Sequence, residues 1–67
     1  MSVARVTEIS STSEQSFEDA IRQGLERATK TLRNVTSAWV KEQRVALQDG
    51  KITHYQVNMQ VTFVLDE

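Results

Sequence analysis

The stretch "KITHYQVNMQVTFVL", residues 51–65, decides the fold of this chain. From Tyr55 onward every second residue is apolar, so an extended strand would project these side chains to one face. The apolar set is Tyr55, Val57, Met59, Val61, Phe63 and Leu65. The intervening set is His54, Gln56, Asn58, Gln60 and Thr62. The alternation predicts a strand with one buried face and one amide-rich face.

A hairpin turn is predicted immediately before this strand. The Asp-Gly dipeptide at residues 49–50 is typical of a two-residue hairpin loop, and residues 37–48 predict the preceding strand. Such a turn fixes the register. The expected pairs are Gln48 with Lys51, Gln43 with Gln56, Lys41 with Asn58, and Trp39 with Gln60. The polar face of the hairpin then carries Trp39 and Gln43, whereas Arg44 is expected on the opposite face.

A strand and a helix are predicted before the hairpin. Residues 3–10 are rich in β-branched side chains, which favour a strand. The cluster "SSTSEQS" indicates a helix start, with Thr12 or Ser13 as the N-cap. Apolar residues then recur in steps of three and four over residues 17–35, the pattern of an amphipathic helix.

Gly24 falls on the apolar face of this predicted helix. Either its missing side chain permits close approach of another backbone, or it is a tolerated weak point that costs ~1 kcal/mol relative to Ala. The order β-α-β-β predicts the α+β class. We expect residues 1–67 to form a single domain in which a three-stranded antiparallel sheet packs on one helix.

The length of the chain points to self-association. Only 67 residues and no cysteine are available to stabilise a core. A strand of about 14 residues spans roughly 46 Å at ~3.3 Å per residue, whereas a compact domain of this length is about 28 Å across. The hairpin must therefore overhang its own domain, and we expect an obligate homo-oligomer that covers it.

Composition argues against several classes of function. The net charge is −1 with no basic stripe, so nucleic acid is not an expected partner. No segment resembles a membrane span or signal peptide, and a cytoplasmic location is expected. An enzyme is not expected either, because His54 is the only histidine and there is no cysteine or phosphate-binding loop. No metal site is predicted, since the paired carboxylates Glu18–Asp19 and Asp66–Glu67 are explained by solvated charge.

The polar face of the hairpin is the candidate site. Amide side chains offer donors and acceptors to the edge of a heterocycle, and an indole offers a flat stacking surface. Trp39, with Gln56, Gln43 and Gln60, could bind a flat ligand that forms hydrogen bonds. Alternatively, Trp39 packs against a neighbouring subunit and the glutamines bond between subunits.

The chain also resembles a known family along essentially its whole length. The segments "ARVTEISSTSEQSFEDAI", "GLERATKTLRNV", "AWVKEQRV" and "DGKITHYQVNMQVTFVLDE" are similar to those of dodecins. The resemblance implies a hollow homododecamer with helices outside and sheets inside. It also implies non-catalytic storage or sequestration of a flavin, riboflavin or FMN. In the family, a tryptophan of the second strand stacks on the flavin ring and a glutamine of the third strand bonds the ring edge.

The resemblance places these roles on particular residues. Gln56 falls on the glutamine position, and the stacking position falls on Ser37, with Trp39 two residues later on the same face. Either Trp39 stacks from one pleat further along, or the chain keeps the shell without flavin and holds ions or another ligand. Gln43 and Ser37 are further candidates for the flavin site, and Arg44 is a candidate for a phosphate or intersubunit contact.

Overall fold

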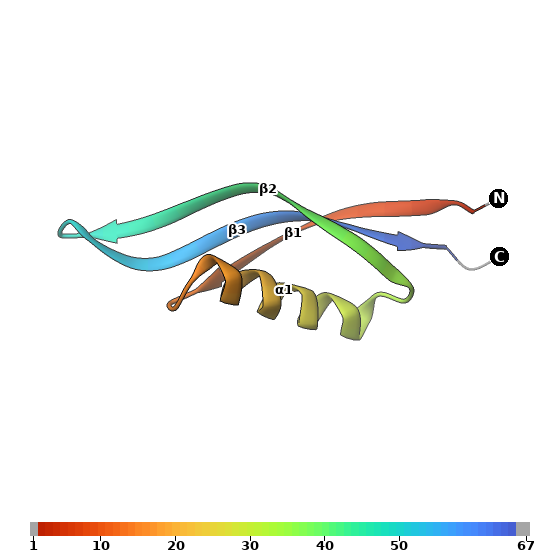
Figure 1. Cartoon of the computed structure of the whole chain (residues 1–67), viewed down its shortest axis with the longest axis horizontal. Helices are drawn as coiled ribbons and strands as arrows, with labels where there is room; N and C mark the ends of the chain where they lie inside the picture. Colours follow the sequence, from red (N-terminus) through yellow and green to blue (C-terminus); the bar gives the residue numbers. More distant parts are fainter. Residues whose placement is uncertain (1, 66–67) are drawn as a thin grey trace.

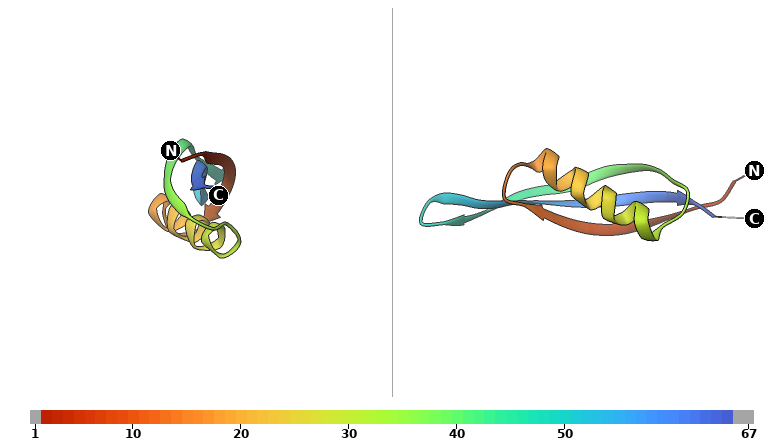
Figure 2. Two further views of the ribbon diagram at one scale, coloured as in Figure 1. Left: turned by 90° about the vertical axis from the view of Figure 1, so that its right-hand side faces the viewer. Right: turned by 90° about the horizontal axis from the view of Figure 1, so that it is seen from below.

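The computed structural model describes residues 2–65. Its elements are β1 (Ala4–Ser13), α1 (Phe17–Thr31), β2 (Val35–Gln48) and β3 (Lys51–Val64). The strands form one antiparallel sheet in the order β1-β3-β2, and α1 lies against one face of it (Figures 1 and 2). The predicted β-α-β-β topology is confirmed.

The central strand β3 divides the sheet into two faces. Val57, Met59 and Val61 are at most 1% exposed and lie on the covered face, which we define as the face toward α1. Val57 and Met59 pack with Ala20 of the helix. The intervening residues of β3 lie on the other side, which we call the open face. As the alternation of residues 51–65 predicted, one face of β3 is buried and the other carries the polar side chains.

The helix begins later than predicted. Ser16 is the N-cap, and its Oγ accepts from the Asp19 backbone N–H at 2.9 Å. The prediction of Thr12 or Ser13 as the cap is wrong because β1 continues through both residues. The Ser13 hydroxyl instead donates to Asp19 Oδ2 at 2.6 Å and accepts from the Gln15 N–H at 2.9 Å. Asp19 thus ties the end of the strand to the first turn of the helix.

The helix also ends earlier than predicted, at Thr31. The chain leaves it through Leu32 and then Asn34, which has a positive φ of 62°. Val35 already belongs to β2, where it pairs with Phe63. An apolar residue at this position meets the sheet rather than extending the helix.

No helix within residues 2–65 is long and apolar enough to cross a membrane.

The β2–β3 hairpin extends beyond the helix (Figure 1). Asp49 and Gly50 have φ of 53° and 77°, as a type I′ turn requires. The molecule measures 51 × 19 × 13 Å, and its radius of gyration is 13.9 Å, against about 11 Å for a compact domain of this length. At the tip, Leu47 and Ile52 are 63% and 50% exposed. The predicted overhang is confirmed.

The hairpin register departs from the prediction over its middle. The pairs Gln48–Lys51 and Trp39–Gln60 are as expected. Between them the pairing is displaced by one residue, because the register shifts near Thr53 on β3 and again near Lys41 on β2. Such β-bulges insert an unpaired residue into one strand. The predicted pairs Gln43–Gln56 and Lys41–Asn58 are therefore wrong.

Gly24 lies where the helix packs tightly against the sheet. A Cβ placed on it would lie 2.8 Å from Cε of Met59 and 3.0 Å from Cβ of Ser11. Contacts this short require a neighbour to move. Of the two explanations of Gly24, the structure supports close approach, but the nearest atoms belong to the side chains of Met59 and Ser11 and not to another backbone.

We expect Gly24→Ala to destabilise the protein. Overpacking costs about 1–3 kcal/mol, which offsets or exceeds the gain of ~1 kcal/mol in helix propensity. The melting temperature, measured at equal protein concentration, should fall by a few degrees. Thr29→Ala, on the exposed side of the same helix, is the control and should not lower it. A rise for Gly24→Ala would contradict the close approach.

Acid should weaken the junction at Asp19. The hydrogen bond from Ser13, followed by that from Arg22, lowers the pKa of Asp19 below its ordinary 3.8 against the opposing effect of burial. The folded state therefore binds fewer protons than the unfolded state. The ionised Asp19 carboxylate therefore stabilises the folded protein above pH 3.8, and this stabilisation is lost as the pH falls through the lowered pKa.

We therefore expect Asp19→Asn to lower the melting temperature at pH 7, with a gap from wild type that narrows below about pH 3.8. Thermal melts between pH 7 and pH 2 measure this gap. Glu18→Gln, at the exposed neighbouring carboxylate, is the matched control and should show no comparable gap. A gap that stays constant down to pH 2 would refute this role for the Asp19 charge.

Candidate functional site

The two bulges decide which side chains of β2 reach the open face. Arg44 pairs opposite Gln56, and its Nε donates to Gln56 Oε1 at 3.0 Å. The expectation that Arg44 lies on the covered face is wrong. Gln43 pairs opposite Val57 and takes the covered side, contrary to its predicted position. The physical reason is that a one-residue shift in register exchanges the two faces of a strand.

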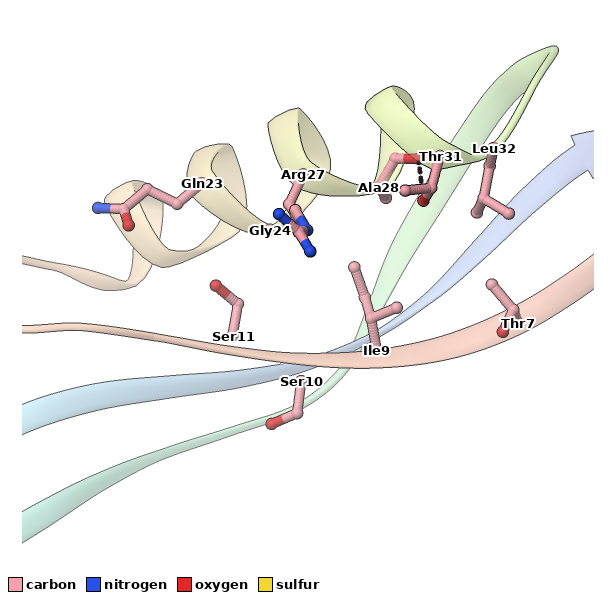
Figure 3. Close-up of a pocket in the computed structure, with 10 residues that line it drawn as sticks. All are labelled: Thr7, Ile9, Ser10, Ser11, Gln23, Gly24, Arg27, Ala28, Thr31 and Leu32. Atoms are coloured by element: carbon pink, nitrogen blue, oxygen red, sulfur yellow. Dashed lines mark hydrogen bonds between the residues drawn. The ribbon is translucent and has the colours of Figure 1, made fainter.

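Gln56 is the centre of a hydrogen-bonded group on the open face. Its Nε2 donates to Ser10 Oγ at 2.8 Å and, at 3.4 Å, to Asn58 Oδ1. Asn58 Nδ2 in turn donates to Glu42 Oε1 at 3.1 Å. In Figure 3, Ser10 points away from the helix, whereas Ile9 on the same strand points toward it. We call this group the amide cluster: Ser10, Glu42, Arg44, Gln56 and Asn58.

The amide cluster borders a small hollow of about 120 Å³. Its lining is Glu42, Gln43, Arg44, Gln56 and Asn58. Pockets for small molecules and cofactors usually occupy about 300–1,000 Å³. One chain therefore supplies polar groups for a ligand but only part of the enclosing surface.

Trp39 lies on the same open face, further along the sheet. It is 50% exposed and pairs opposite Gln60. Since Gln60 follows Gln56 by four residues, the indole and the Gln56 amide are separated by roughly 13 Å along the strand. Ser37 pairs opposite Thr62, one pleat beyond Trp39. The structure thus places Trp39, Ser37, Arg44 and Gln56 on one face, with Trp39 and Gln56 well apart.

An ion pair bridges the sheet near Trp39. Lys41 Nζ lies 3.4 Å from Oε2 of Glu8, which belongs to β1. Lys41 is the unpaired residue of the bulge, and the contact carries its side chain across β3. Both groups are about half exposed, so the pair contributes roughly 0–1 kcal/mol. It adds charged groups of both signs to the Trp39 end of the open face.

Sequence reasoning did not identify three members of the amide cluster. Asn58 was visible in the alternation of β3, but Glu42 depends on the bulge at Lys41, and Ser10 depends on the pairing of β1 with β3. Within residues 2–65 there is no group of three or more potential metal-ligating side chains. Asp66 and Glu67 lie outside the described residues.

A larger hollow, of about 500 Å³, lies between α1 and the edge strand β1 (Figure 3). Its walls include Ile9, Gly24, Ala28 and Leu32. None of the predicted site residues borders it. The open face, which carries the exposed indole and the amide groups, is therefore the stronger candidate site.

These features define a small α+β protein with one helix on the covered face of its sheet and an indole and amides on the open face. The Dodecin family profile matches residues 3–66. A dodecin from Thermus thermophilus is 40% identical over 65 residues, which cover 97% of this chain and 94% of the relative. The chain belongs to the dodecin family.

Solved structures agree with this assignment. The dodecin from Streptomyces davaonensis is 47% identical and superposes with a TM-score of 0.93, covering 98% of this chain and 97% of that one. A calcium dodecin from Mycobacterium tuberculosis, described as a calcium-chelating antigen with a novel calcium-binding site, is 32% identical with a TM-score of 0.83. That match covers 96% of this chain and 91% of the other.

Proposed function

We propose that this protein binds a flavin, riboflavin or FMN, without catalysis, and stores or sequesters it inside a self-assembled homododecamer. The observation that carries the proposal is the half-exposed indole of Trp39 on the same open face as the amide cluster. Membership of the dodecin family supports flavin binding and assembly in general.

The single chain supports the assembly part of the proposal. Within residues 2–65, the buried apolar side chains are few: Ala20, Ala28, Val57, Met59 and Val61. Trp39, Leu47 and Ile52 are at least half exposed, and monomeric proteins seldom leave large apolar areas uncovered. Other copies of the chain would cover these side chains and enclose the hollow beside the amide cluster. The open faces would then line the interior.

The residues of the open face fit a flavin in type. The Trp39 indole supplies a flat stacking surface, and Gln56 supplies an amide to the hydrogen-bonding edge of the ring. Because some 13 Å separates them along one strand, a ring stacked on Trp39 would meet the Gln56 amide of a second copy. Ser37 is small and leaves room beside the indole.

We assign no catalytic role to the open face. In the part of the chain that the structure describes, His54 contacts the Thr53 hydroxyl at 3.4 Å rather than a carboxylate, so no acid orients its ring for proton transfer. A bound flavin would supply its own redox chemistry, whereas this chain would bind and shield it. The calcium dodecin relative favours one alternative, a shell that holds ions instead of flavin.

We expect native mass spectrometry to show twelve chain masses, and flavin added in even numbers after incubation with riboflavin or FMN. Paired binding follows if two copies form each site. Calcium, added in a parallel sample, tests the alternative. Twelve chain masses that take up calcium but no flavin would overturn the flavin proposal and leave the shell.

Trp39 is the only tryptophan, so its fluorescence reports directly on the proposed stacking. We expect riboflavin to quench this emission and Trp39→Ala to weaken binding by about 1–3 kcal/mol, the range for a base stacked on an aromatic side chain. Trp39→Phe should retain part of the affinity. Isothermal titration of particles of normal size provides the binding constants.

The matched control for the site is a pair of glutamines on opposite faces. Gln56→Ala should weaken binding, and Gln43→Ala should weaken it much less, because the register places Gln43 opposite Val57 although the residue also borders the hollow. If Trp39→Ala binds as wild type does while Trp39→Ser combined with Ser37→Trp binds more tightly, the stacking role of Trp39 is wrong.

A further inference from the structure

The hydrogen bonds of the amide cluster run in one direction. Arginine can only donate, so the Gln56 carbonyl oxygen faces Arg44 and its NH₂ faces away. At the other end the Glu42 carboxylate can only accept, so the Asn58 NH₂ faces Glu42 and its oxygen faces Gln56. Arg44 therefore donates to Gln56, Gln56 donates to Asn58, and Asn58 donates to Glu42, which is the final acceptor.

The two charged ends of this series lie on one strand. Glu42 and Arg44 are two residues apart on β2 and pair directly opposite Asn58 and Gln56. Without a charged neighbour, an amide can turn over and exchange its oxygen and nitrogen. Ser10, the other partner of Gln56, would not prevent this because a hydroxyl both donates and accepts.

We propose that Arg44 and Glu42 are positioning residues, which fix the amides of Gln56 and Asn58 in one orientation and so determine how a flavin is recognised. This inference rests on the proposed flavin function. It assigns Arg44 a role through Gln56, not through the flavin phosphate.

The fixed orientation determines what Gln56 offers to a ligand. Its oxygen has one lone pair engaged by Arg44 and a second one available. Its NH₂ has one hydrogen bond to Ser10 at 2.8 Å and only a long one, 3.4 Å, to Asn58. The amide thus presents an acceptor on the β2 side and a donor on the β1 side.

This pattern is complementary to the pyrimidine edge of a flavin, which has an imide N–H between two carbonyl oxygens. The imide N–H would meet the Gln56 oxygen and a ring carbonyl would meet its NH₂. With the ring held in one position by stacking, an amide turned the other way would place its NH₂ against the imide N–H. The charges on β2 therefore select one docking direction, and hydrogen bonds to charged groups are stronger than those between neutral ones.

Comparison of riboflavin with FMN tests this role, because only FMN carries a phosphate. We expect Arg44→Met to weaken riboflavin binding about tenfold, the loss of one hydrogen bond of ~1.4 kcal/mol. Arg44→Lys, which keeps a group that only donates, should restore much of it. If Arg44→Met weakens FMN binding alone, Arg44 contacts the phosphate directly and the proposal is overturned.

A second comparison tests whether Arg44 acts through Gln56. In the Gln56→Ala background, Arg44→Met should have no further effect on riboflavin binding. The exchange of both charges, Glu42→Arg with Arg44→Glu, conserves net charge but reverses the series. It should assemble normally and lose at least as much riboflavin affinity as Arg44→Met. Wild-type affinity in the exchange variant would refute the positioning role.

The failure of flavin binding itself would be recognised separately. If the wild-type shell binds neither riboflavin nor FMN, the flavin function is wrong, and so is the assigned ligand. The coupling of Arg44 to Gln56 is then tested without ligand, from the melting temperatures of Arg44→Met, Gln56→Ala and the double variant. Non-additive shifts support the coupling of Arg44 to Gln56, whereas additive shifts overturn it.

Discussion

The alternation of the central strand β3 is the constraint on which the rest of the structure depends. Strand β3 pairs with β1 on one side and β2 on the other, so its two faces set the faces of the whole sheet. Val57 and Met59 are buried against α1, and this burial commits Gln56 and Asn58 to the opposite side. The hydrophobic core and the polar site are therefore two consequences of one pattern.

The same strand explains why the chain is incomplete alone. The 14-residue strands β2 and β3 extend beyond the single helix, and the tip of their hairpin leaves Leu47 and Ile52 exposed. In the proposed assembly, other copies would bury these side chains and would also enclose the shallow hollow at the amide cluster. Under that proposal, assembly and binding are one requirement, because the copies that cover the exposed side chains would also complete the candidate site.

Several features were predictable because they depend on neighbouring residues. The Asp49-Gly50 turn adopts the positive φ values that its sequence favours, and the apolar period of the helix marks the face that meets Val57. The errors arose where two local signals competed. Ser16 rather than Thr12 caps the helix since β1 continues to pair with β3 as far as Ser13. Val35 fits the helical period equally well but pairs in the sheet.

The sequence by itself determined the order of the elements, the buried face of β3, and the position of Gln56 and Trp39 on the other face, because alternation and turn chemistry are local. Only the tertiary structure decided that Arg44, not Gln43, joins Gln56. That outcome depends on bulges at Lys41 and Thr53, which carry neither glycine nor proline to signal them. The position of a bulge is set by how two strands twist and pack against each other over their length. Local patterns of residue types do not reveal this position.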